Sequence, residues 1–427
     1  MAFVISILFG SLAYQALGAD PIADKVQSLP DCAPLPSNMF SGYLPVTQQK
    51  ALHYVFVESM DKPATDPILL WFNGGPGCSS LSDFFVQHGP YIFDDGETVI
   101  KPNPYPWSIR ANVLDIDSPA GVGYSIGNTT DDLLSNDIST ADDAFIALQN
   151  FYKAYPQYRK NDLWITGESY AGIYSPYLAW KIHQWNLEQE MNNWNDTYNL
   201  KGFIVGNGMT DMYIDTDNVL LESVANWNLI PVSLWKQMDA LECTYFWGKV
   251  SELQHNAEGC DELYKKGMGL IKDLDIYDLF RTQYNANTNT QSTLKPSVSQ
   301  RRFLHSRHPL KQAKDSYISY DMESYVNRPD VRQALNIPSF VQPFQDCNDD
   351  LYNTYSVLRE GSIWIYNILL GYEKRYRIMH YSGDTDGAVA TLGTRRWITQ
   401  QEGWNVTNEW RPWTTDGDVC HHSWSGT

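Results

Sequence analysis

The residues best suited to covalent chemistry lie between Asp162 and Gly172, where the sequence reads DLWITGESYAG. A short apolar strand runs there into a G-x-S-x-A turn, and a segment of helical period follows at 173–185. A serine on such a turn lies at a helix N-terminus, where small neighbours let the backbone bend and the helix dipole favours a developing alkoxide. Ala171 stands where the general G-x-S-x-G pattern has glycine. Such matches also arise by chance, but the flanking strand and helix favour Ser169 as the nucleophile of an acyl transfer.

A second candidate segment, WFNGGPGCSS at 71–80, comes directly after a predicted strand at 68–72. The adjacent glycines Gly74 and Gly75 can turn backbone N–H groups inward, which is what the stabilisation of an oxyanion requires. The structural alternative is a Gly-Pro turn that merely ends the strand. Because the segment lies upstream of the serine turn, we expect it to form the oxyanion loop.

The third candidate is an acidic loop, SGDTDGAV at 382–389, at the end of a predicted strand at 376–381. Asp384 and Asp386 could also belong to a calcium-like loop, but no further ligand spacing follows. An acid that follows the serine in the chain and lies at the end of a late strand fits a serine–acid–histidine order. We therefore expect the loop to supply the catalytic acid.

Apolar runs of strand length alternate along the chain with longer segments of helical period. The predicted strands are 52–58, 68–72, 113–116, 163–166 and 202–205, with a helix at 142–155. This alternation implies parallel strands joined by crossover helices, and so an α/β fold with a mostly parallel central sheet flanked by helices. Catalytic loops are then expected at the carboxyl ends of the strands.

From about 212 to about 322 the strand rhythm disappears, and we expect an inserted helical cap with helices at 219–228, 233–241 and 262–274. Within it, the segment 284–300 is rich in Asn, Thr, Gln and Ser, and basic residues follow up to Lys314. The segment 284–314 is interpreted as a solvated loop, with proteolytic processing as the sharper alternative.

The composition argues against some classes of binding partner and cofactor. The 427 residues carry a formal net charge of -19, with a pI of about 4.8, which argues against nucleic acid because phosphate binding needs clustered Lys and Arg. The six cysteines include no C-x-x-C pair, which weakens a zinc or redox interpretation. We expect neither a metal nor a cofactor.

The N-terminal residues 1–19 form a short apolar stretch that ends in small residues, and we interpret them as a signal peptide that precedes the main domain, 20–427. An N-terminal anchor is the alternative. No later segment reaches a spanning length, so we expect no membrane attachment after cleavage. Three glycosylation acceptors, Asn128, Asn195 and Asn405, agree with passage through the secretory pathway.

Six ordered segments together resemble the serine carboxypeptidase family: WFNGGPGCSS, DSPAGVGYS, GESYAG, VGNGMTD, YVNRPDV and YSGDTDGAV. The resemblance covers nearly all of 29–413 and implies an α/β-hydrolase that releases C-terminal amino acids from peptides and proteins through an acyl-enzyme. It further implies that Ser169 attacks the scissile carbonyl, that Asp386 orients a histidine, and that the N–H groups of Gly75 and Tyr170 form the oxyanion hole.

The same resemblance implies that Asn73 and Glu168 hold the free carboxylate of the substrate's last residue. A protonated Glu168 can donate to that carboxylate whereas an ionised one repels it, so the enzyme should favour mildly acidic conditions. The family's second glutamate in this cluster corresponds here to Gln87. An amide donates at any pH, so we expect a pH profile less sharply acidic than that of the relatives.

By likeness to the family, Cys78 should pair with Cys347, and Cys243 with Cys260 in the cap, while Cys32 and Cys420 stay unassigned. A lysosomal, vacuolar or extracellular location and a homodimer are compatible with the family. The preferred C-terminal residue of the substrate is not revealed.

The C-terminal end departs from the family pattern, which places a G-x-G-H-M-x-P histidine motif well beyond the aspartate loop. After Gly417 the chain reads DVCHHSWSGT, and only His421 and His422 follow Asp386. Three explanations are open: a truncated or frame-shifted gene model, which we favour, an inactive homologue that binds peptides, or an unusual use of His421 or His422. Without a base, most rate enhancement would be lost.

Two other classes of function remain as alternatives. An esterase or acyltransferase could use the same serine chemistry, because a fold does not fix a substrate. A catalytically impaired peptide-binding homologue is the non-enzymatic alternative.

Overall fold

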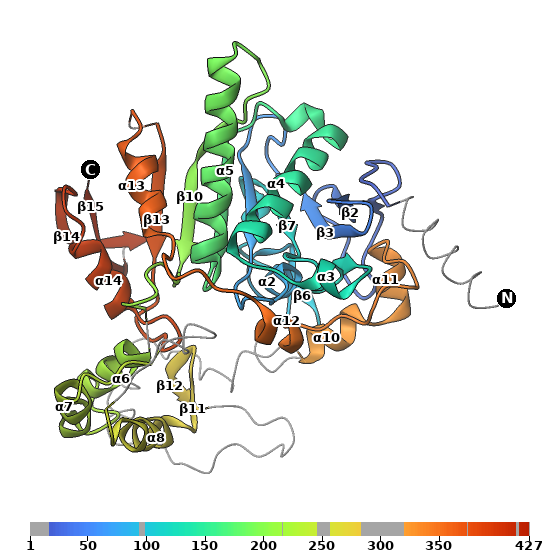
Figure 1. Ribbon diagram of the computed structural model, residues 1–427. Helices are drawn as coiled ribbons and strands as arrows, with labels where there is room; N and C mark the ends of the chain where they lie inside the picture. The colour runs from blue at the N-terminus through green and yellow to red at the C-terminus, as the bar shows by residue number, and fades with distance from the viewer. Residues whose placement is uncertain are drawn as a thin grey trace.

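The computed structural model describes residues 17–93, 99–215, 217–245, 257–282, 320–373, 375–415 and 418–426. A nine-stranded sheet forms its centre in the order β1-β2-β3-β7-β4-β9-β10-β13, with β8 also paired to β3 (Figure 1). The strands from β7 to β13 in this order are parallel, and those around β2 and β3 are antiparallel. The strands are β1 (Lys25–Val26), β2 (Met39–Pro45), β3 (Lys50–Val57), β4 (Ile68–Phe72), β7 (Asn112–Ile116), β8 (Ile126–Gly127), β9 (Leu163–Glu168), β10 (Leu200–Gly206) and β13 (Arg377–Tyr381). The α/β class is confirmed.

The sheet divides the interior into two cores. In β2 and β3 successive side chains point to opposite faces, so Leu44 and Phe56 join one core while Tyr43 and Val57 join the other. β7 is buried along its whole length, as expected of a central strand that is covered on both faces.

Helices cover both faces of the sheet. α4 (Asp137–Ala154) and α5 (Ala171–Met191) pack on each other and supply the first core, and α13 (Ile363–Gly371) packs beside α5. The second core is closed by α2 (Ser80–Asp83), the π-helical turn η1 (Phe84–His88), α10 (Tyr320–Val326) and α11 (Pro329–Ala334). The remaining elements are α3 (Thr130–Leu133), α12 (Asp349–Thr354), α14 (Thr391–Thr399), the 3-10 turns η2 (Trp107–Ile109) and η3 (Pro156–Tyr158), and the paired strands β5 (Tyr91–Ile92) and β6 (Lys101–Pro102).

The cap forms a separate group of elements below the sheet in Figure 1. It contains α6 (Asp217–Asn226), α7 (Val232–Ala240) and α8 (Cys260–Ile271), which share their own hydrophobic core. The predicted helices of the cap are present, and the structure adds a hairpin that was not predicted, formed by β11 (Leu274–Asp275) and β12 (Asp278–Thr282). The predicted loop at 284–314 lies outside the described residues, as does nearly all of the predicted signal peptide.

A buried polar network joins β2, β3 and the end of β7. The Oγ of Ser41 lies 3.0 Å from Nε2 of His53, and Nδ1 of His53 lies 3.1 Å from Oδ2 of Asp117. All three side chains are almost fully buried. The Ser41 hydroxyl also donates to the carbonyl of Leu335 at 2.7 Å, so the network ties the sheet to the segment after α11.

The last described strands, β14 (Val406–Thr415) and β15 (Asp418–Gly426), form a two-stranded sheet of their own. His421 and His422 lie in β15, paired with Trp413 and Pro412. Within the described ranges, no helix has both the length and the apolarity needed to cross a bilayer.

Candidate active site

Ser169 lies on the sharp turn between β9 and α5. Its φ of 58° is in the left-handed region, which is costly for a residue with a side chain and is held here by backbone hydrogen bonds. The Ser169 N–H donates to the carbonyl of Gly206 at 3.0 Å, and its carbonyl accepts from Gly172 at 2.9 Å and from Met209 at 3.0 Å. The expected nucleophile turn is therefore present, and its serine is partly exposed.

The loop after β4 packs directly against this serine. A Cβ atom built on Gly74 would lie 2.6 Å from Cβ of Ser169, 2.9 Å from its Oγ and 2.5 Å from the backbone nitrogen of Tyr170. Only a glycine permits that approach. Gly75, with a φ of 112°, continues the turn. The structure therefore brings the predicted oxyanion loop to Ser169, while the roles of the Gly75 and Tyr170 N–H groups stay predictions.

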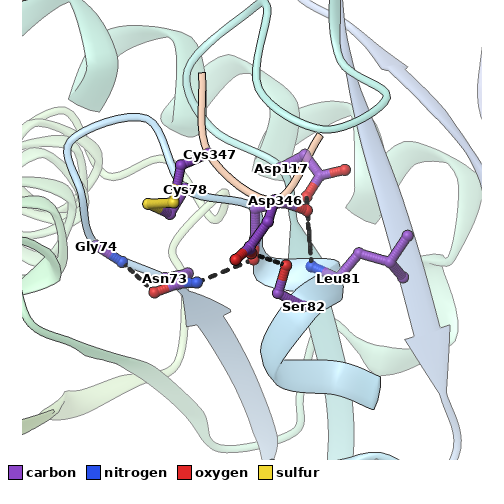
Figure 2. The surroundings of a disulfide bond; sticks show 9 residues. Asn73, Gly74, Cys78, Leu81, Ser82, Asp117, Asp346 and Cys347 are labelled. Atoms are coloured by element: carbon purple, nitrogen blue, oxygen red, sulfur yellow. Dashed lines mark hydrogen bonds between the residues drawn. A yellow bond between two sulfur atoms is a disulfide. The ribbon is translucent and has the colours of Figure 1, made fainter. Parts of the chain in front are cut away.

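Figure 2 shows how the loop is held from behind. Asn73 donates from Nδ2 to the carbonyl of Ser79 at 3.0 Å and accepts from the Gly74 N–H at 2.6 Å. A segment far along the chain closes over it: the Ser82 hydroxyl bonds to Asp346, and Cys78 is joined to Cys347. Asn73 thus shapes the loop, and its contact with a substrate carboxylate stays a prediction.

The disulfide pairing agrees with what the family likeness implies. The structure joins Cys78 to Cys347 and Cys243 to Cys260, as the family likeness implies. Cys32 carries a free, half-buried thiol that lines a cavity of about 700 Å³ beside the N-terminal segment. None of the predicted catalytic residues lines that cavity.

Asp386 reaches the same end of the sheet as Ser169. β10 lies between β9 and β13, and its last residue, Gly206, pairs with Glu168 on one side and with Tyr381 on the other. The chain therefore leaves β9 into the serine turn and β13 into the acidic loop at the same end of the sheet, one strand apart. Ser169 and Asp386 thus lie at the carboxyl ends of the parallel strands, where catalytic loops are expected.

The Asp386 carboxylate is buried and accepts three hydrogen bonds. Oδ1 accepts from the N–H of Ala388 at 2.8 Å, and Oδ2 accepts from the N–H of Val389 at 3.1 Å and from Nδ2 of Asn207 at 3.0 Å. Burial raises the pKa of Asp386, and these hydrogen bonds act in the opposite direction. Asp384, the alternative acid, is exposed.

Sequence reasoning gave no role to Asn207, which connects the two loops. With a φ of 37°, it donates from its backbone to the carbonyl of Tyr381 at 2.9 Å and accepts at Oδ1 from the Gly383 N–H at 2.9 Å. The same side chain reaches Asp386. The signal was available, because an asparagine between two glycines after a strand is typical of a left-handed turn.

Glu168 and Gln87, both predicted to bind the substrate carboxylate, are brought together. Nε2 of Gln87 donates to Oε1 of Glu168 at 3.0 Å. Burial raises the pKa of Glu168, the Gln87 hydrogen bond and the charge of His88 lower it, and Asp386 raises it. Gln87 is exposed and Glu168 is partly exposed, so a ligand can reach this pair.

The cap adds a residue that the sequence interpretation could not place. The β11–β12 hairpin joins the acidic loop through two backbone hydrogen bonds, Gly387 to the Ile276 carbonyl at 2.8 Å and Leu279 to the Thr385 carbonyl at 2.9 Å. Tyr277 lies in the turn of the hairpin. Although the residue as a whole is exposed, partial burial of its phenol raises the pKa, and the charges of Asp386, Asp346 and Glu168 raise it further. Tyr277 therefore lies close to the acids of the site.

The described histidine side chains are engaged elsewhere. His53 contacts Ser41 and Asp117, His88 contacts Asp115, His183 contacts Tyr376, and His380 contacts Tyr366. None of these four is hydrogen-bonded to Ser169 or Asp386. In the same part of the chain, no cluster of three or more His, Cys, Asp or Glu side chains could hold a metal ion.

Comparison with known proteins gives a consistent result. The family described as serine carboxypeptidase matches residues 30–424. The chain is 33% identical to the lysosomal protective protein of Mus musculus, over 93% of this chain and 85% of that protein. It is 31% identical to serine carboxypeptidase 1 of Hordeum vulgare, over 95% of this chain and 86% of that protein.

A solved structure has the same fold. Kex1(delta)p, a prohormone-processing carboxypeptidase from Saccharomyces cerevisiae, superposes with a TM-score of 0.68 at 19% sequence identity, covering 95% of this chain and 89% of that one.

Proposed function

The chain belongs to the serine carboxypeptidase family, and from this premise we propose that Ser169, the loop at Gly75 and Asp386 remove C-terminal amino acids from peptides. The observation that carries the proposal is the packing of Gly74 against the strained Ser169, because the backbone amides of a loop so close to the serine can stabilise an oxyanion there.

In the proposed reaction Ser169 Oγ attacks the last peptide carbonyl, and the N–H groups of Gly75 and Tyr170 stabilise the oxyanion. The C-terminal amino acid leaves, and water then hydrolyses the acyl-enzyme. Asp386 orients the general base that accepts the Ser169 proton. Asn73, Gln87 and Glu168 bind the free carboxylate of the leaving residue, which makes the enzyme an exopeptidase.

We place the protein in the secretory pathway, in a lysosome-like compartment or outside the cell. Its likeness to a protein named lysosomal protective protein supports this, and so does the exposure of Asn128, Asn195 and Asn405, which leaves all three open to glycosylation. Peptide and protein C-termini are the substrates, and a homodimer stays a prediction.

A second candidate is a peptide-binding homologue with little catalysis. The engagement of His53, His88, His183 and His380 in other contacts favours it, because each is committed away from Ser169.

A fluorophosphonate probe and a matched pair of peptides test both candidates. The enzyme should label at Ser169 and should cleave a blocked dipeptide with a free C-terminal carboxylate about 10- to 100-fold faster than its C-terminal amide. Equal rates for the two peptides would overturn the carboxylate site. Failure to label in a folded protein that still binds the free acid would favour the binding homologue.

A further inference from the structure

Just before β1 the chain folds into a tight turn that ends on a buried acid. The turn is closed by the Asp24 N–H, which donates to the Asp20 carbonyl at 2.8 Å. The Asp20 side chain supports it, since its Oδ1 accepts from the N–H groups of Ile22 at 2.9 Å and Ala23 at 3.4 Å. Pro21, whose φ is fixed by its ring, follows Asp20 directly. The position of the Asp20 nitrogen is therefore set by residues on its C-terminal side.

The carboxylate of Asp24 contacts that nitrogen. Its Oδ2 accepts from the Asp20 N–H at 2.9 Å and from the hydroxyl of Tyr54, on β3, at 2.7 Å. Asp24 is buried, whereas Asp20 is exposed. One hydrogen bond therefore joins a backbone nitrogen at the surface to an acid in the interior.

Three further elements pack around this acid. On β2, a Cβ atom built on Gly42 would lie 2.4 Å from Cγ of Asp24, so only a glycine leaves room for the carboxylate. The N–H of Ser41, also on β2, donates to the Asp24 carbonyl at 2.8 Å. The Tyr54 hydroxyl lies 2.7 Å from that of Tyr155, at the end of α4. Asp24 thus connects the turn to β2, to β3 and, through Tyr54, to α4.

The charge of Asp24 is only partly compensated by these contacts. Burial raises the pKa of Asp24 to about 6, and the charge of Asp20 acts in the same direction. The hydrogen bonds from Tyr54 and from the Asp20 N–H lower it, as does the charge of His53 on β3. Tyr155 senses the charge of Asp24 as well. Because both bonded donors are neutral, a positive charge in place of either one would stabilise the ionised acid.

We propose that removal of residues 1–19 turns the Asp20 nitrogen into an α-ammonium group, which forms an ion pair with Asp24 and fastens the new N-terminus to the sheet. Hydrolysis of the Ala19–Asp20 peptide bond by one water molecule leaves a carboxylate on Ala19 and an ammonium on Asp20. That nitrogen already lies within hydrogen-bond distance of the carboxylate, so a charged donor replaces a neutral one without rearrangement of the turn. Cleavage at any other bond leaves the Asp20 nitrogen in a neutral amide.

The ion pair is a consequence of export and takes no part in the peptidase reaction. The inference rests on the placement in the secretory pathway that belongs to the proposed function, and its readout needs no peptidase activity. In the precursor the Asp20 nitrogen carries no charge, so only the processed chain should hold its N-terminal turn through an ion pair.

The test uses the full chain, secreted from cultured eukaryotic cells behind its own leader. N-terminal sequencing should find Asp20 as the first residue. Pairing with Asp24 should raise the pKa of the α-amino group by about one unit, so an acylating reagent near neutral pH should modify the terminus roughly tenfold more slowly than in Asp24→Asn. Mass spectrometry of the N-terminal peptide measures the rate. A different first residue, or equal rates in the parent and in Asp24→Asn, would overturn the inference.

Asp215→Asn is the matched control. Asp215 is also a buried acid whose pKa burial raises, to about 7, but it accepts from the N–H groups of Thr210 and Asp211 after β10, near the opposite edge of the sheet. Acylation of the terminus should stay slow in this variant. An acceleration equal to that in Asp24→Asn would point to general loosening of the fold and would equally refute the ion pair.

If Asp24→Asn does not fold, the pH dependence of acylation in the parent decides. The terminus should titrate about one unit higher in the folded chain than in the same chain unfolded in urea, and equal values would refute the ion pair. A chain that keeps residues 1–19 would refute the secretory placement as well, whereas a secreted chain with an unprotected Asp20 amine would refute the ion pair alone.

Discussion

Two of the sites in this molecule that contain a serine and an aspartate differ in their hydrogen bonding and exposure. Ser41, His53 and Asp117 form an unbroken chain of hydrogen bonds inside the sheet. Ser169 and Asp386 lie at the carboxyl end of the sheet, where the serine is strained and partly exposed and is joined to no histidine whose side chain the structure describes.

The buried trio is closer to a catalytic triad in connectivity, yet it cannot act as one. The Ser41 hydroxyl donates its hydrogen bond to the Leu335 carbonyl, and no substrate can reach a side chain that is fully buried. Asp117 also accepts from Ser79 at 2.5 Å and from Tyr124 at 3.2 Å. Complete satisfaction of polar groups serves stability, whereas nucleophilic chemistry needs access, a turn that exposes the serine, and amides aimed at the developing charge.

The largest contrast is expected between the two serines. Ser169→Ala should abolish probe labelling and lower hydrolysis of a free-acid peptide by about 10³-fold or more, because no other group can form the acyl-enzyme. Ser41→Ala should leave kcat/KM per folded molecule within about twofold, since the site is remote. Loss of activity in both variants to the same extent would contradict the assignment of Ser169 as the nucleophile and Ser41 as a structural residue.

The buried trio should dominate stability. Asp117→Asn breaks its contact with His53 and is expected to lower the free energy of unfolding by about 3–5 kcal/mol, measured by urea denaturation. Asp386→Asn, which alters a carboxylate held by neutral donors at the sheet edge, should cost less stability and more activity. A reversed order of the two stabilities would contradict the assignment of the roles.

A third experiment adds an acid at the exposed site. Gln87→Glu places a third carboxylate beside Glu168 and Asp83, so binding of a free-acid peptide must take up more than one proton. Its affinity should match that of the parent in acid and be about tenfold weaker near neutrality, giving a steeper pH profile. A profile unchanged from that of the parent would count against the role given to Gln87.

The smallest effect on activity is expected from Asn207, which helps to orient Asp386. Asn207→Ala removes the side chain that connects the two loops and should lower kcat/KM by roughly tenfold while KM changes little, because Asp386 loses one of three donors. Asn228→Ala is matched to it, as Asn228 also has a positive φ, of 59°, but lies in the cap. It should cost about 1 kcal/mol of stability and no activity.

The sequence predicted the parts of the fold that are set by local pattern. The strand at 68–72 was placed to the residue, since an apolar run there is bounded by proline and by Asn-Gly. β2 was missed because Ser41 and Gly42 interrupt its apolar character, although both are buried. The antiparallel pairing of β3 with β7 depends on contacts distant in the chain, which no local pattern reveals.

In the candidate site, too, some residues follow from a local sequence motif and others only from contacts between distant parts of the chain. The positions of Ser169 and Asp386 follow from motifs with a strand in front of them. The contact of Gln87 with Asp83 could not be found in this way, since an aspartate near a helix end is usually solvated, whereas Asp83 is buried by strands that meet only in the folded state. Tyr277 was not singled out because the sequence analysis did not predict the hairpin that carries it.

The hairpin's attachment to the acidic loop has a consequence for how this enzyme could diversify. Both bonds, Gly387 to Ile276 and Leu279 to Thr385, join main chain to main chain, so they do not depend on which side chain the hairpin carries at Ile276. On the loop side a glycine is needed, because a Cβ at Gly387 would lie 2.9 Å from Leu279. Mutations on the hairpin could therefore accumulate and retune which peptides are accepted, while the acid stays registered to its neighbours. The choice of substrate and the position of Asp386 could then change independently, although the same hairpin is involved in both.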